Sequence, residues 1–132
     1  MMRTLGAIFA MAVVVSCRTM PRQPLATDVC EISKNSEAFD GKVVTLHAAV
    51  LSDLIERTFL VSDDCPSETV SIAMAADAEG AELLRHALVD VMPNGAITAT
   101  FIGTFEWRAN ETPARVLNVR AVRDLVANDD RS

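Results

Sequence analysis

From residue 43 onward, the chain contains several segments in which apolar side chains recur at every second position. The first such segment has its apolar series at Val44, Leu46, Ala48 and Val50. A period of two is typical of β-strands with one buried face. The same alternation recurs in four further segments: residues 57–62, 69–74, 97–107 and 115–126. The sequence therefore predicts five strands, with Gly103 interrupting the fourth where a barrel strand has to bend.

Several apolar positions of the last two strands share a parity and are predicted to face the core. In the fourth strand these positions are Ile97, Ala99, Phe101, Phe105 and Trp107. In the fifth strand they are Leu117, Val119, Ala121 and Leu125. In the second strand, Phe59 and Val61 share one face.

Two other segments carry helical patterns. Asp28 can cap a short helix that runs to about residue 36, because Glu31 three residues later completes a capping-box-like pair. A second helix is predicted to start at Asp77 and to end before Pro93, with a single apolar stripe facing the core. That stripe consists of Leu84, Ala87, Leu88 and Val91. The element order is therefore β-β-β-α-β-β, preceded by a short helix.

This order resembles the OB fold, a five-stranded Greek-key barrel in which the helix after strand three closes one end. The resemblance covers about residues 41–126. More specifically, Cys30, the run FDGKVV at 39–44 and Cys65 are similar to small OB-like domains of secreted and lipid-anchored bacterial proteins. The resemblance implies a mainly-β fold and a disulfide between the N-terminal helix and the loop after strand two, but no activity. The alternative fold is an open α+β sheet with one helix.

The first sixteen residues have the layout of a secretory signal: Arg3 near the start, an apolar run over residues 5–15, and Ser16 before Cys17. The apolar run is shorter than the roughly 20 residues that span a bilayer. The sequence Val14-Val15-Ser16-Cys17 resembles a bacterial lipobox, which implies cleavage before Cys17 and a diacylglycerol on its thiol. Because the next residue is not aspartate, the resemblance favours the outer membrane. The alternatives are an ordinary signal peptide, in which Cys17 is incidental, and a retained membrane helix.

The cysteine count fits an exported protein. The chain has three cysteines, so lipid on Cys17 leaves Cys30 and Cys65 as an even pair in an oxidising compartment. A disulfide between them would stabilise the fold by roughly 4 kcal/mol in the chain-entropy model. Unpaired thiols are the alternative, and two cysteines without a nearby histidine make a poor zinc site.

Four segments follow from these features. Residues 1–16 are predicted as the signal peptide and residues 17–27 as the lipidated cysteine with a proline-bearing tether. Residues 28–128 form the OB-like domain, and residues 129–132 form a disordered tail. The chain of 132 residues is long enough for one such domain.

Charge disfavours nucleic acid as a partner. The chain has 18 acidic and 12 basic side chains and a formal charge of −6 at pH 7, whereas nucleic acids need a basic face. Strands two and three of an OB barrel should also offer aromatic platforms, and only Phe59 occurs there.

No catalytic constellation is found. Both histidines, His47 and His86, are predicted to be exposed and are not spaced as metal ligands. Carboxylates crowd the turns beside strand two, but without the glycine and alternating ligands of a calcium loop. They are Asp53, Glu56, Asp63, Asp64 and Glu68. The sequence thus predicts no catalytic residue, metal or cofactor, and a small envelope hydrolase or calcium-dependent enzyme that uses these carboxylates is the alternative.

On an OB barrel, the usual ligand face lies between the first hairpin turn, residues 52–56, and the last loop, residues 108–114. Leu54 and Ile55 in that turn, together with Trp107 and Arg108, are predicted to form a contact patch. The predicted function is a non-enzymatic, lipid-anchored envelope module that binds a protein or glycan in the periplasm. A structural spacer is the further alternative.

Overall fold

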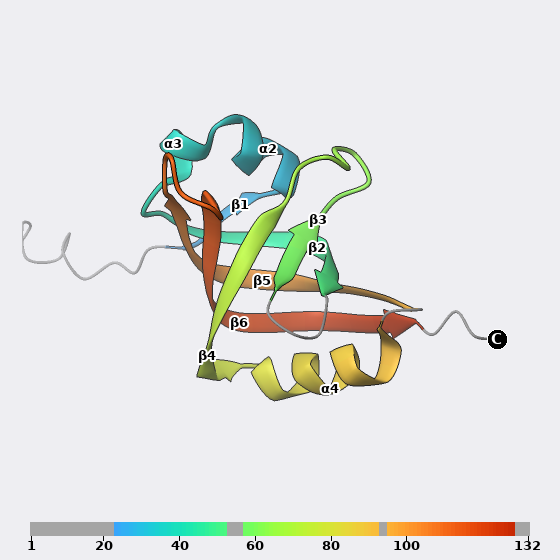
Figure 1. Ribbon diagram of the computed structural model, residues 1–132. Helices are drawn as coiled ribbons and strands as arrows, with labels where there is room; N and C mark the ends of the chain where they lie inside the picture. Colours follow the sequence, from blue (N-terminus) through green and yellow to red (C-terminus); the bar gives the residue numbers. More distant parts are fainter. Residues whose placement is uncertain (1–22, 53–56, 93–94, 129–132) are drawn as a thin grey trace, which may run out of the picture.

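The computed structural model describes residues 23–52, 57–92 and 95–128. Its elements are, in chain order, β1 (Leu25–Thr27), α2 (Val29–Lys34), α3 (Ser36–Phe39), β2 (Val43–Ser52), β3 (Thr58–Val61), β4 (Val70–Glu79), α4 (Ala81–Val91), β5 (Ala96–Trp107) and β6 (Arg115–Asn128). From β2 to β6 this is the predicted order β-β-β-α-β-β. Figure 1 shows α4 below the strands and the pair α2 and α3 above them.

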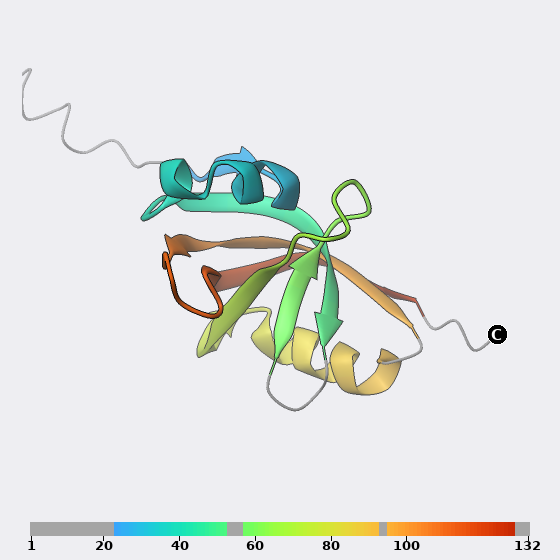
Figure 2. The same ribbon diagram turned by 45° about the horizontal axis from the view of Figure 1, so that its top comes forward.

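The strands pair around a closed ring. β2 pairs antiparallel with β3 and with β5, β3 pairs with β4, and β5 pairs with β6. A parallel pairing of β4 with β6 completes the ring. The predicted mainly-β class is confirmed, and the ring differs from the open α+β sheet that was the alternative. Figure 2 shows the same arrangement from a second direction, with α4 beneath the strands.

The core fills the inside of this ring. Phe101 and Phe105 are fully buried, as are Ile97 and Ala99 on the same face of β5, so the predicted core face of this strand is confirmed. Burying each large apolar side chain contributes about 1.5–3 kcal/mol. β3 contributes Leu60 to the core, and its Phe59 and Val61 lie together on the opposite face.

The end of β6 departs from the predicted alternation. Leu117, Val119 and Ala121 are buried as expected, but Leu125 is only partly buried. The register of β5 and β6 shifts between Thr98 and Thr100, and Asp124 nearby has a φ of 53°. Leu125 still packs against the core, whereas Val122 is buried directly after Ala121, next to the second register shift between Ile102 and Gly103.

Gly103 lies where β5 and β6 also change register. A Cβ atom at this position would collide with the main-chain carbonyl oxygen of Asn118. Gly103 breaks the apolar face as predicted, but β5 continues through it, and the close approach of the neighbouring backbone explains why glycine is needed there.

The helix α4 begins later than predicted. β4 continues to Glu79, which pairs with Ala121 of β6, so residues from Asp77 onward extend the strand and do not start the helix. Gly80 then makes the turn into α4 with a φ of 79°, a conformation that glycine adopts without steric cost.

The N-terminal helix is capped as predicted, because the backbone N–H of Glu31 donates to Oδ1 of Asp28 at 2.8 Å. It ends at Lys34, and the separate short helix α3 follows. Leu25–Thr27, expected in the tether, instead forms β1 and pairs in parallel with β2. Residues 1–16, Cys17 and residues 129–132 lie outside the described part of the chain. No helix in the described part has both the length and the apolar character needed to cross a membrane.

Candidate functional site

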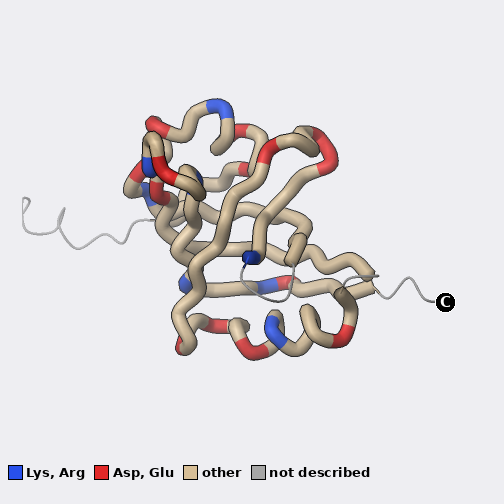
Figure 3. The backbone as a smooth tube through the Cα atoms, viewed as in Figure 1, with Lys and Arg blue, Asp and Glu red and all other residues tan. Residues whose placement is uncertain are grey.

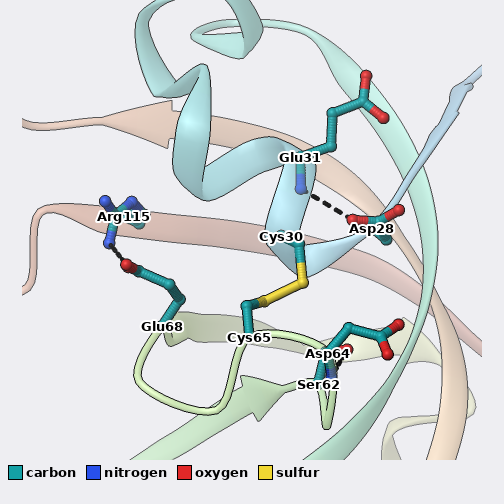
Figure 4. The surroundings of a disulfide bond; sticks show 8 residues. All are labelled: Asp28, Cys30, Glu31, Ser62, Asp64, Cys65, Glu68 and Arg115. Carbon is teal, nitrogen blue, oxygen red and sulfur yellow. Dashed lines mark hydrogen bonds and ion pairs between the residues drawn. A yellow bond between two sulfur atoms is a disulfide. The ribbon is translucent and has the colours of Figure 1, made fainter.

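The predicted disulfide is present at the end of the ring that carries α2 and α3. Cys30 and Cys65 are joined by an S–S bond of 2.07 Å, with their Cα atoms 5.7 Å apart. Figure 4 shows that this bond connects α2 to the loop between β3 and β4. It fixes the position of that loop, which leads into β4.

A groove of about 610 Å³ runs across β3, β4, the start of β6 and the loop at residues 108–114. From the strands it is lined by Thr58, Phe59, Ser71, Ile72, Ala73, Arg115 and Val116, and at its margins by Arg57, Thr69, Arg108, Thr112, Pro113 and Ala114. The groove borders the loop at residues 108–114, one of the two loops between which the ligand face was predicted. Leu54 and Ile55, predicted as part of the contact patch, lie outside the described residues.

The floor of the groove is set by strand register. Phe59 pairs with Ser71, and Ser71 pairs with Val116, so these three residues form a row across β3, β4 and β6. Their neighbours Leu60 and Leu117 are fully buried in the core, which places the row on the outer face of the ring. Ser71, in the middle of the row, has a small side chain, which leaves space in the groove beside the Phe59 ring.

The groove also follows a place where two strands separate. Within the described residues, β3 and β4 share only the pairs Phe59 with Ser71 and Leu60 with Val70. Beyond them, Thr58 and Ile72 both line the groove without being paired. β4 therefore presents a stretch of strand edge that has no β3 partner.

The loop at residues 108–114 forms one wall. The backbone N–H of Arg108 donates to the carbonyl of Ala114 at 2.7 Å, and that of Glu111 donates to the carbonyl of Arg108 at 3.1 Å. Asn110 has a φ of 68°, in the left-handed region that asparagine tolerates better than most residues. These contacts hold the ends of the loop together beside the groove.

Arg108 is held by Glu106, which is held in turn by Asn118. Its Nε donates to Oε2 of Glu106 at 2.9 Å, and Nδ2 of Asn118 donates to Oε1 of Glu106 at 2.7 Å. The hydrogen bond from Arg108, and then the one from Asn118, lower the pKa of the Glu106 carboxyl below its ordinary value. The same carboxylate raises the pKa of Arg108. No contact to the two terminal nitrogens of Arg108 is formed within the described residues.

Arg115, at the other end of the loop, is fully engaged. Its Nε donates to Oγ of Ser36 at 3.0 Å, Nη2 to the carbonyl of Ser33 at 3.2 Å, and Nη1 to Oε2 of Glu68 at 3.2 Å. The guanidinium also lies 5.7 Å from the centre of the Trp107 ring. Figure 4 shows the ion pair with Glu68 next to the disulfide. This arginine therefore joins α2 and α3 to the ring.

Trp107 belongs to a different cleft from the groove. A shallow cleft of about 850 Å³ lies between the α2–α3 segment and the ends of β5 and β6, and Trp107 and Arg115 line it. Arg108 lines the groove instead, because successive side chains of an extended segment point to opposite sides. Trp107 and Arg108 therefore line different clefts, which share Arg115. The predicted contact patch also includes Leu54 and Ile55, which lie outside the described residues, and it stays a prediction.

The remaining candidate residues lie apart from the groove. His47 is exposed and its Nδ1 is 3.1 Å from Oγ1 of Thr100. His86 is exposed beside Glu82 on α4. Asp63 and Asp64 are exposed in the loop that carries Cys65. Asp53 and Glu56 lie outside the described residues, within which no group of three His, Cys, Asp or Glu side chains could hold a metal ion.

No protein-family model and no curated protein sequence matches this chain. Sequence reasoning missed Asn118 and Ser71, because each acts through a neighbour on another strand. It also missed Glu106, although its partner Arg108 lies two residues away along the chain. The outward position of Phe59 was the one local signal, since it places an aromatic ring on the face that OB folds use for binding.

Proposed function

We propose that this chain is a lipid-anchored module of the bacterial cell envelope that binds a protein or glycan partner and catalyses no reaction. The observation that supports the proposal is the groove over β3, β4 and β6, on the face where OB-like folds bind their ligands. A hollow of about 610 Å³ with both apolar and polar side chains has the dimensions of a ligand site.

The lining of the groove supports binding over catalysis. Its described residues are arginine, hydroxyl-bearing and apolar side chains. General acid–base chemistry uses groups such as histidine or a carboxylic acid within hydrogen-bond reach of the reacting atom, and nucleophilic catalysis adds an activated serine or cysteine beside a base. Among the described lining residues the groove presents no histidine, cysteine or carboxylate.

The anchor rests on the sequence of the first seventeen residues and is supported by the disulfide. Disulfides persist in exported proteins and are rare in the bacterial cytosol. In our proposal, acyl chains on Cys17 hold the domain at the outer membrane, facing the periplasm. More than one chain is needed, because a single acyl chain binds a membrane only marginally.

The anchor is tested by Cys17→Ser in the full chain. We expect the variant to leave the membrane fraction and to lose labelling by a fatty-acid analogue, while Cys30 and Cys65 remain bonded. A variant that still sediments with membranes and still takes up the label contradicts the anchor.

The groove is tested by photo-crosslinking in living cells. A benzophenone amino acid is placed at Ala73, which lines the groove, or at Ala38, which lines the cleft beside α3. Both alanines are exposed, so the two variants are matched. We expect a discrete adduct from Ala73 that disappears when Ser71→Trp fills the groove, and no such adduct from Ala38. Adducts from Ala38 alone contradict the proposal.

A further inference from the structure

The groove differs in charge from the rest of the molecule. The chain has 18 acidic and 12 basic side chains, and Figure 3 shows acidic positions on the helices and loops at both ends of the ring. Three arginines, Arg57, Arg108 and Arg115, line the groove, and no Asp or Glu among the described residues does. Arg108 and Arg115 are each ion-paired to a carboxylate outside the lining, Glu106 and Glu68. The terminal nitrogens of Arg108 are therefore the part of this lining that favours a negatively charged ligand group.

Arg108 has the geometry to bind that charge. Its Nε is fixed by Glu106, which is itself held by Asn118. Because the guanidinium is planar, fixing Nε also fixes the direction of both terminal nitrogens. A fork of two parallel N–H groups matches a carboxylate, and an arginine that is already ordered loses little further freedom on binding. Arg115 is not available in this way, because all three of its nitrogens have partners in the protein.

The strand edge beside the groove indicates the shape of the ligand. β4 beyond Ser71 has no β3 partner in the described structure, so an extended chain can lie along that edge and pair with its main-chain groups. Side chains of such a chain alternate at every second residue. One of them can contact Phe59 and Val116 on the floor while another reaches Arg108.

We propose that the groove binds an extended peptide segment of a partner protein, and that Arg108 binds an acidic side chain of that segment. This inference rests on the proposed function and specifies its ligand. A glycan is less well matched to this site, because it lacks the main chain that would pair with the edge of β4. The groove also offers one aromatic ring, Phe59, which is half-buried, and Trp107 lines the other cleft.

The test uses the purified full chain and three pools of capped, immobilised octapeptides. One central position is Glu, Gln or Lys, and the other positions are randomised over uncharged residues. We expect the glutamate pool to retain the protein about tenfold more strongly than the glutamine pool, as a charge-assisted bidentate pair implies. The lysine pool should retain least.

Two matched variants link this preference to the groove. Arg108→Gln should lower retention on the glutamate pool to the level of the glutamine pool. Arg120→Gln removes an exposed arginine of β6 outside the groove and should leave retention unchanged. Thermal unfolding of both variants checks that each remains folded.

The other outcomes overturn the inference in distinguishable ways. Equal retention on the glutamate and glutamine pools, or no effect of Arg108→Gln, rejects the role of Arg108. If no pool retains the protein, a peptide is rejected as the ligand of the groove. If an oligosaccharide array retains the protein and Arg108→Gln abolishes that retention, the ligand is a glycan. The proposed function is judged separately, because the adduct from Ala73 does not depend on which ligand is bound.

Discussion

Arg108 and Arg115 lie at the two ends of one loop and both line the groove, yet their surroundings differ. Arg115 donates from all three nitrogens to Ser33, Ser36 and Glu68 and has lost most of its contact with water. Arg108 has one nitrogen held by Glu106, and its terminal nitrogens remain available to a ligand. Arg115 stabilises the fold, whereas Arg108 is positioned for binding.

The contrast extends to the two regions around these side chains. The α2–α3 segment is fixed to the ring by a disulfide and by the Arg115 contacts, which cross between distant parts of the chain. The groove, in comparison, lies where, among the described residues, the pairing of β3 with β4 ends after two residue pairs. Cross-links therefore lie at one side of the loop, and strand edge and the terminal nitrogens of Arg108 lie at the other. Such a division is expected where a rigid part of a fold supports a binding surface.

The largest expected effect is on the disulfide region. Replacing both cysteines, Cys30→Ser with Cys65→Ser, should lower the free energy of unfolding by about 4 kcal/mol, because the unfolded chain regains the freedom of a closed loop. Urea unfolding of the full chain, with and without reductant, measures the change. Reductant should destabilise the wild type and have no effect on the double variant. Equal stability of the oxidised and reduced wild type contradicts this account of the region.

An intermediate effect is expected from the matched arginine variants. Arg115→Gln should lower the free energy of unfolding by about 1–3 kcal/mol, because Ser36, Glu68 and the carbonyl of Ser33 lose partly buried partners. Arg108→Gln should leave it nearly unchanged, since its ion pair with Glu106 is open to solvent. Urea unfolding compares the two directly. Equal losses in both variants remove the distinction between a structural arginine and a binding one.

The smallest expected effect is on the titration of Glu106. Its folded-state pKa is lowered by Arg108 and Asn118, so its contribution to stability is present above the ordinary carboxyl pKa and is lost as pH falls through the lowered value. In Arg108→Gln the pKa should rise toward the ordinary value. Carboxyl chemical shifts recorded over a pH series measure it, and an unchanged pKa in that variant shows that Arg108 does not hold Glu106.

Local patterns predicted much of the fold. Alternation of apolar residues located β2, β3, β5 and β6, and Asp28 marked the start of the N-terminal helix, because strand faces and helix caps are set by residues close in sequence. The disulfide was predictable because two of the three cysteines, Cys30 and Cys65, remain once Cys17 is assigned to the lipid anchor. The extension of β4 to Glu79 and the pairing of Leu25–Thr27 were not, since each depends on a distant strand as its partner.

The candidate site was predicted only in part. The groove borders the loop at residues 108–114 that the sequence pointed to, but its floor is a row of Phe59, Ser71 and Val116 that exists only through the register of three strands. Adjacent residues Trp107 and Arg108 were placed together by their proximity in sequence, and the extended backbone at the end of β5 directs them into two clefts. Local patterns in one sequence do not show how distant strands are aligned with each other, so this part of the site could not be predicted.

The account is tested most directly by amide chemical shifts of the isotope-labelled full chain during titration with the peptide that the glutamate pool retains best. The account predicts that the largest changes occur at Ser71, Ala73 and Val116, with small changes at Ser33 and Trp107, and that Arg108→Gln weakens the binding about tenfold. Large changes at Ser33 and Trp107 together with unchanged signals at Ser71 and Val116 would contradict it, because they would place the ligand in the cleft beside α2 and α3.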